Sequence, residues 1–223
     1  MHQVLRQRLA GGPVVALALL VAAPAAGADQ RPETDHLVWA GLGMAVPTYF
    51  IGVVAHEGSH ALAAKLAGAE LTELHLLPGV HHGHFYFGYV RTRGLVSRGA
   101  RSFFLIAPKL VDLAVLGSYS AAVLSDHTPD NHYGRLALTV LATGFWVDFS
   151  KDIPAFWAHS DVVKLYDLIG ATTELRRLPL RLVHLGLSAA AGTVLWIGYR
   201  DVFDDDEAPA SAAFLVPLAT GSF

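Results

Sequence analysis

Four long apolar segments constrain the fold of this chain more than any other feature. Each can cross the roughly 30 Å hydrocarbon core of a bilayer as a helix, the last one with some help from its flanks. They are Leu37–Leu66, Phe103–Leu124, Leu136–Trp157 and Leu182–Tyr199. Hydrophobic residues make up 53% of the chain and charged residues only 16%, which is too apolar for an ordinary soluble domain. We therefore expect an all-α polytopic membrane protein with about four transmembrane helices.

The two ends of the chain differ in character from the apolar segments. The first 28 residues have the pattern of a signal peptide, because two arginines precede an apolar run and small residues end at Ala28. Cleavage after Ala28 and retention as a signal anchor both leave Asp29 outside the cytoplasm. Residues 29–200 then form the transmembrane domain. Residues 201–223 are acidic and then apolar, and we expect this tail to be disordered.

The loops between the apolar segments alternate in charge. Basic residues follow the first and third segments, and acidic residues follow the second and fourth. The basic ones are Arg91, Arg93, Arg98 and Arg101, then Lys164, Arg176, Arg177 and Arg181. The positive-inside rule places both basic loops in the cytoplasm, which agrees with an exported N-terminus. We expect an integral protein of a bacterial inner membrane, with the end of the first segment at the cytoplasmic side.

The region from Glu70 to Val90 is too short and too polar to cross the bilayer. Pro78-Gly79 marks a turn, with alternating or aromatic residues on both sides. We expect a small β-hairpin or a re-entrant element at the membrane surface, between the first two spans. This region carries a histidine cluster that we interpret as solvated surface, with a second metal ion as the alternative. The cluster consists of His75, His81, His82 and His84.

A possible metal-binding sequence, His56-Glu57-Gly58-Ser59-His60, lies inside the first apolar segment. Two histidines four residues apart share one face of a helix and can bind one Zn²⁺. Zinc lowers the pKa of a water to about 7, and Glu57 is placed to take the proton. A charged residue in the middle of a spanning helix costs about 2.5 to 3.5 kcal/mol, so Glu57 is a functional candidate. The alternative is a pair of interfacial histidines with no ligand.

A catalytic zinc site normally has three protein ligands, and the third must come from elsewhere in the chain. The topology returns the end of the third segment to the same side as the two histidines. Asp161 is the preferred ligand, although Ser160-Asp161 is also a typical cap for the helix that follows. Asp148 is a ligand, a partner that orients a histidine, or a contact between helices. Asp152 and His159 are weaker alternatives.

Other features narrow the possible functions. The chain has no cysteine, so histidine, aspartate and glutamate are the plausible metal ligands. The net charge is −3 and there is no basic run, which argues against a nucleic-acid surface and leaves the lipid bilayer as the expected partner. Asp112 lies near Lys109 in the second segment, and an ion pair or a helix contact accounts for both.

The segment Val53–Ala64, followed by Pro78-Gly79, resembles the first motif and hairpin of the site-2 protease family of intramembrane zinc metalloproteases. The resemblance implies that an aspartate of a second motif is the third zinc ligand. Lys151-Asp152-Ile153-Pro154 and Ser160-Asp161-Val162 occupy the corresponding places, so this role carries over to Asp161. The asparagine, leucine and glycine of that motif are absent here. Ala107-Pro108 is similar to a Gly-Pro element of the family.

The resemblance implies a zinc-dependent endopeptidase that cleaves a transmembrane segment of another membrane protein near the cytoplasmic face. His56, His60 and Asp161 would bind zinc, and Glu57 would act as general base and then as proton donor. The competing hypothesis is a membrane protein that uses the metal for structure or regulation and does not cleave. A third is a helical scaffold without metal.

Overall fold

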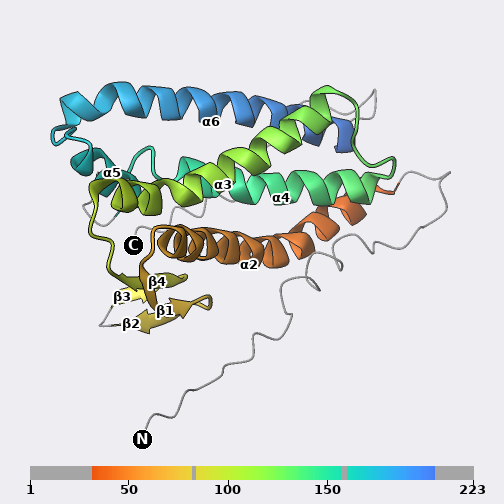
Figure 1. The fold of residues 1–223 in the computed structure, drawn as a ribbon. Coiled ribbons are helices and arrows are strands. Elements are labelled where there is room, and N and C mark those ends of the chain that lie inside the picture. The colour runs from red at the N-terminus through yellow and green to blue at the C-terminus, as the bar shows by residue number, and fades with distance from the viewer. Residues whose placement is uncertain (1–31, 82–83, 157–159, 204–223) are drawn as a thin grey trace, which may run out of the picture.

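The computed structural model describes residues 32–81, 84–156 and 160–203, and most of them are helical. Four long helices pack side by side, and a short helix and a small β region lie at one end (Figure 1). The helices are α2 (Thr34–Leu66), α3 (Arg98–Leu124), α4 (His132–Ser150), α5 (Asp161–Leu168) and α6 (Glu174–Phe203). The predicted signal segment lies outside the described residues. So does the predicted tail, apart from residues 201–203, which form the end of α6.

Three of these helices, α2, α3 and α6, are long and apolar enough to cross a membrane by length and composition. The helix α4 does not qualify, since its 19 residues include His132, Arg135 and Asp148 and leave no sufficiently apolar window of spanning length. It lies instead at the centre of the bundle, against α2, α3 and α6. The expectation of a helical membrane protein is thus supported with three candidate spans, where the sequence pattern predicted four.

The third apolar segment was predicted to run from 136 to 157, but its helix begins at His132 and ends at Ser150. The side chain of Asn131 caps its start by accepting a hydrogen bond from the Gly134 N–H at 2.7 Å. Its end has a clear cause, because Pro154 has no N–H to donate to the Ser150 carbonyl. The Ile153 N–H donates to that carbonyl instead, at 3.0 Å, and tightens the chain into a turn.

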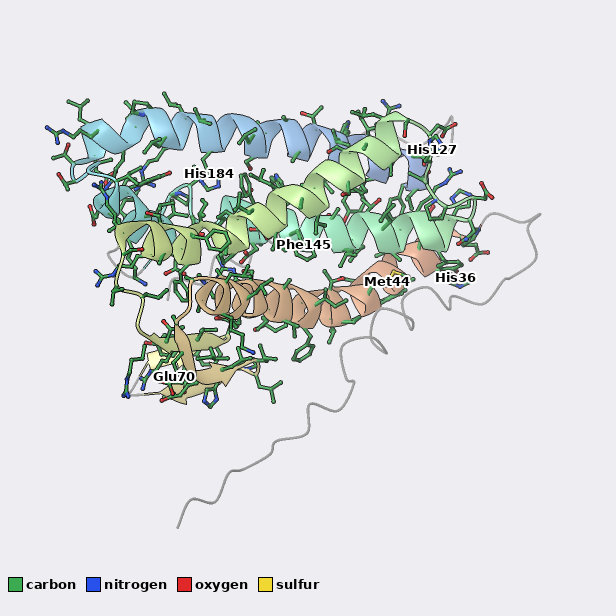
Figure 2. The ribbon with its side chains drawn as sticks, viewed as in Figure 1. His36, Met44, Glu70, His127, Phe145 and His184 are labelled. Carbon is green, nitrogen blue, oxygen red and sulfur yellow. The ribbon has the colours of Figure 1, made fainter. Side chains whose placement is uncertain are left out.

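The core of the bundle is built around α4. Its inward face packs against buried side chains of α3 and α6, and Phe145 lies inside the bundle (Figure 2). The residues of this core are Leu116, Tyr119, Ala142, Phe145, Phe149 and Leu195. On the α2 side, Gly144 allows close approach, since an added Cβ there would lie 2.5 Å from the Thr48 side chain. The central helix is therefore held from three sides.

The predicted hairpin is confirmed, as two nested antiparallel pairs, but the turn predicted at Pro78-Gly79 is wrong, because Gly79 begins a strand and the chain reverses between His81 and His84. The outer pair joins β1 (Glu70–His75) to β4 (Tyr89–Arg93), and the inner pair joins β2 (Gly79–His81) to β3 (His84–Tyr86). Gly68, at a φ of 75°, ends α2 and turns the chain into β1. The sheet consequently folds back along α2 and contacts it through β1 and β4 (Figure 1).

The elements that carry the candidate chemistry all reach one end of the molecule. His36 and His127 lie at one end of the bundle and Glu70 lies at the other (Figure 2). The last third of α2, the start of α3, the end of α4 and the helix α5 share the end marked by Glu70 (Figure 1). The expected return of the third apolar segment to the side of the two histidines is therefore confirmed.

Candidate metal centre

His56 and His60 lie one turn apart on α2 and face the same side of the helix. Their ring centroids are 5.1 Å apart, and His60 is only 4% exposed. Small residues around them, among them Ala61 and Ala64, let α3 approach α2 closely. The four-residue spacing has the geometric effect expected from the sequence.

Asp161 meets this histidine pair from α5. Its Oδ2 atom lies 3.1 Å from Nε2 of His60, and one ligand atom from each of His56, His60 and Asp161 lies within 4.8 Å of the others. A tetrahedral zinc ion with bonds of about 2.1 Å separates its ligand atoms by about 3.4 Å, so small adjustments suffice to accommodate it. Two imidazoles and a carboxylate are also donor types that zinc prefers.

The capping role that competed for Asp161 falls on its neighbour. Ser160 is the N-cap of α5, and its side chain accepts a hydrogen bond from the Val163 N–H at 3.5 Å. Asp161 is the first helical residue, and its carboxylate is left to face His60 and Lys164. The cap thus orients the helix so that Asp161 points at the histidines.

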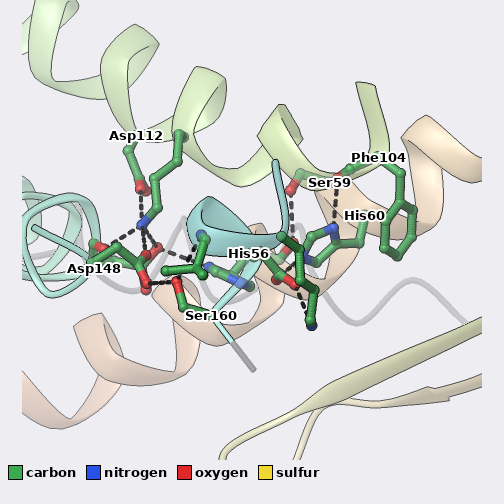
Figure 3. Close-up of polar contacts among 12 residues, drawn as sticks. His56, Ser59, His60, Phe104, Asp112, Asp148 and Ser160 are labelled. Atoms are coloured by element: carbon green, nitrogen blue, oxygen red, sulfur yellow. Dashed lines mark hydrogen bonds and ion pairs between the residues drawn. The ribbon is translucent and has the colours of Figure 1, made fainter. Parts of the chain in front are cut away.

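Both histidines have the Nδ1 atom engaged as a donor. Nδ1 of His56 donates to Oδ2 of Asp148 at 2.8 Å, and Nδ1 of His60 donates to the backbone carbonyl of Phe104 at 2.8 Å (Figure 3). Because a carbonyl only accepts, the proton of His60 must sit on Nδ1. Nε2 of His60, which contacts Asp161, is then the ring nitrogen that would exchange its proton for a metal ion, and such partners also fix the ring orientation.

The Phe104 carbonyl is available because of a proline one helical turn later. In a regular helix this carbonyl would accept the N–H of residue 108, but Pro108 has none. His60 supplies the missing donor and also stacks on the Phe104 ring, with centroids 4.4 Å apart. The proline inside α3 therefore has a direct effect on the orientation of a candidate ligand.

The other candidates from the sequence have different positions. Asp148 lies behind His56 and orients it, which was one of its three expected roles. Asp152 faces away from the histidines and contacts Ser160 and Lys109, each at 2.9 Å. His159 lies outside the described residues. Within the described part of the chain, the structure thus brings His56, His60 and Asp161 together and leaves Asp152 apart from them.

The electrostatic surroundings keep Asp161 ionised. Burial opposes ionisation of this carboxyl, but the hydrogen bond with His60 and the ammonium of Lys164, 2.9 Å away, hold its pKa well below the usual range. A carboxylate is the form that binds a metal ion.

Glu57 lies between the two histidines in sequence and is covered by the β region. An added Cβ on Gly88 would lie 2.8 Å from Cγ of Glu57 and 3.0 Å from the side chain of Val53. Beside this contact, the rings of Tyr49 and Phe87 meet edge to face, with centroids 5.7 Å apart. The backbone between β3 and β4 therefore forms one wall next to the Glu57 carboxylate.

The turn that leads toward Asp161 is held from α6. The buried guanidinium of Arg181 donates to the carbonyls of Ile153 and Ala155 at 2.5 and 2.6 Å. Close by, His184 donates to the Phe149 carbonyl at 2.8 Å. From the sequence, Arg181 was interpreted only as one of the positive charges of a basic loop. Its position shows that it also holds the turn after α4 in place.

Lys109 has more partners than its place in the sequence indicated. It was paired with Asp112 alone, whereas the residue is 4% exposed and its ammonium contacts three aspartates, Asp112, Asp148 and Asp152. The sequence did hold one indication of these contacts. A lysine inside an apolar segment is rare unless it has charged partners or a function there. Periodicity gave no indication of the partners on α4 and on the turn after it.

No protein-family model, curated protein or solved structure matches the chain. Two imidazole nitrogens and one carboxylate, with a second carboxylate beside them, suit a catalytic zinc site that keeps a coordination position open.

Proposed function

We propose that the chain is a zinc-dependent intramembrane endopeptidase that cleaves a transmembrane segment of a membrane-protein substrate. The observation that carries the proposal is the cluster of His56, His60 and Asp161, whose ligand atoms lie within 4.8 Å beside Glu57. Two of its members, His56 and His60, belong to α2, which is long and apolar enough to cross a membrane. Ionisable side chains inside a membrane-spanning helix cost free energy, and a hydrolytic function would explain why the helix carries them. The motifs that resemble the site-2 protease family support the same function.

The residues divide the work between binding and proton transfer. Nε2 of His56, Nε2 of His60 and a carboxylate oxygen of Asp161 would hold the ion. When bound, zinc supplies Lewis acidity and lowers the pKa of a water to about 7. Glu57 takes a proton as general base and returns it to the leaving amine as general acid. The partners at Nδ1 keep both imidazoles in the ligand tautomer.

The β region would present the substrate to this centre. A helical substrate must unwind before its amide bond can be attacked, and an extended segment can pair with the edge of a two-stranded sheet. Because β1 and β4 contact α2 beside Glu57, a segment held on this sheet would run next to the general base.

The membrane arrangement completes the proposal. We place α4 as a fourth crossing that the other three helices enclose, after an N-terminal signal segment. The basic residues that follow α2 and α4 then face the cytoplasm of a bacterial inner membrane, and cleavage occurs near that face.

The test uses the full chain, purified and reconstituted with single-span membrane proteins as substrates. We expect wild type to contain zinc and to cleave, and a chelator to stop cleavage. Glu57→Gln should keep zinc and lose cleavage, whereas His56→Ala should lose both. Glu70→Gln, an exposed change in β1, is the matched control and should behave like wild type. Cleavage by Glu57→Gln at the wild-type rate would refute the assignment.

A second candidate is a metal site with a structural or regulatory role and no proteolysis. It is favoured by the missing asparagine, leucine and glycine of the second motif and by the bond of Lys164 to Asp161. Wild-type protein that holds stoichiometric zinc, is destabilised by a chelator and cleaves none of the reconstituted substrates would support it over the protease.

A further inference from the structure

Lys109 is a buried cation at the point where three elements meet. Its ammonium lies 2.9 Å from Asp152, 3.4 Å from Asp112 and 3.5 Å from the carboxylate of Asp148, and it also donates to the Asp148 backbone carbonyl. Asp112 belongs to α3, Asp148 to α4 and Asp152 to the turn that follows α4. A charge in an apolar helix needs such partners, but one carboxylate would be enough for that purpose.

One of these contacts leads to the first histidine. The Asp148 carboxylate that Lys109 approaches also accepts the Nδ1 proton of His56, at 2.8 Å (Figure 3). Lys151 binds the other oxygen of the same carboxylate from the surface side. Lys109 is therefore connected to His56 through one intervening residue, Asp148. It is a buried group that holds the hydrogen-bond partner of the His56 ring in place.

A second contact leads to the aspartate on α5. Oδ2 of Asp152 faces Lys109 at 2.9 Å, and Oδ1 of Asp152 accepts a hydrogen bond from Ser160 at 2.9 Å. Ser160 caps α5 and directly precedes Asp161. The position of Asp161 therefore depends on a chain of bonds that starts at the same ammonium.

We propose that Lys109 is a positioning residue of the metal centre, because its ammonium holds in one place the two aspartates that set His56 on α2 and Asp161 on α5. The inference rests on the proposed metal site. Without Lys109, Asp148 and Asp152 would repel each other at close range, and each would shift the ligand that it supports. The two ligands come from elements far apart in sequence, so this network fixes their separation.

The test measures metal binding by the full chain in detergent, with Co²⁺ alone as the probe and its d–d absorption as the signal. Lys109→Met should weaken Co²⁺ affinity by about 10- to 100-fold, the usual range for partners behind the ligands, and should change the absorption spectrum. Lys65→Met removes the same charge from an exposed site at the end of α2 and should leave both unchanged.

A double variant separates positioning from folding. Lys109→Met leaves the buried carboxylates of Asp112 and Asp152 without their ammonium and can unfold the protein. Lys109→Met with Asp112→Asn restores the net charge, while the bonds to Asp148 and Asp152 are still missing. We expect this double variant to stay folded, with a thermal unfolding midpoint above that of Lys109→Met, and to show the same 10- to 100-fold loss of affinity. Asp112→Asn alone should bind Co²⁺ like wild type.

The possible failures are distinguishable. If wild type does not bind Co²⁺ or zinc, the proposed metal site itself is wrong. If wild type binds Co²⁺ and the folded double variant binds it within about twofold, with the same spectrum, the site stands and the role of Lys109 is refuted.

Discussion

The backbone carbonyl of Phe104 accepts the Nδ1 proton of His60, at 2.8 Å, because Pro108 leaves that carbonyl without a helical donor. A break in the hydrogen bonding of one helix is repaired by a side chain of another. The repair determines the tautomer of a candidate metal ligand and ties α3 to α2 at the centre.

Pro108→Ala tests this relationship. Alanine restores an N–H that competes with His60 for the Phe104 carbonyl, so His60 loses its fixed orientation even though α3 becomes a better helix. We expect zinc affinity to fall by about tenfold or more while the thermal unfolding midpoint stays or rises. Pro47→Ala is the control, since Pro47 also lies inside a helix but is exposed and precedes the centre by more than two turns. Equal zinc affinity in both variants would contradict the role given to Pro108.

The sequence was sufficient for the parts of the site that depend on local periodicity. His56 and His60 share a helix face because of their spacing, and the residues around Pro78-Gly79 form the strands of a hairpin, although the chain reverses between His81 and His84. The choice of Asp161 depended on the alternation of the loops, which returned α5 to the histidines. These features follow from short-range rules and from topology.

The partners behind the ligands could not be read from the sequence. The contact between Phe104 and His60, and the contacts of Lys109 with Asp148 and Asp152, depend on the rotation of one helix relative to another. That rotation is set by packing, for instance by the close approach at Gly144, and periodicity does not specify it. The length of α4 was overestimated because apolarity continues past Ser150, whereas its hydrogen bonding ends there.

Replacement by the neutral asparagine should affect zinc binding differently at Asp148 and at Asp161. Asp161→Asn removes a proposed ligand, and we expect zinc to be lost on dialysis. Asp148→Asn keeps a side chain that can accept from His56 at Nδ1, so zinc should remain bound with an affinity about 10- to 100-fold lower. Metal analysis of both proteins after dialysis against a weak chelator checks this order. The reverse order would make Asp148 the third ligand.

Arg181 should contribute to stability and not to chemistry. Arg181→Met leaves the carbonyls of Ile153 and Ala155 without donors, at a cost of about 1 to 3 kcal/mol for each buried group. We expect a clear fall in the thermal unfolding midpoint in detergent. Arg176→Met, at an exposed position on the same helix, should change the midpoint little. A midpoint equal to that of wild type would mean that the turn does not depend on Arg181.

Gly88 should be required for cleavage although it belongs to the β region. A methyl group at this position would lie 2.8 Å from Cγ of Glu57 and 3.0 Å from the His75 carbonyl, so either Glu57 or the wall beside it must move. We expect Gly88→Ala to keep zinc, because the metal ligands lie elsewhere. Its cleavage rate should fall at least tenfold, since a correctly placed general base contributes a factor of about 10² to 10⁴ to the rate.

Gly79→Ala supplies the matched control for Gly88. An added Cβ at Gly79 meets no atom within 4 Å, so this variant should cleave like wild type. Parallel measurement of zinc content and cleavage rate then separates damage to the wall from damage to the metal centre. If Gly88→Ala cleaves as fast as Gly79→Ala, the wall does not control Glu57, and the hairpin is a neighbour of the centre without a part in its chemistry. If Gly88→Ala loses zinc as well, the β region supports the ligands themselves, which the described contacts do not predict.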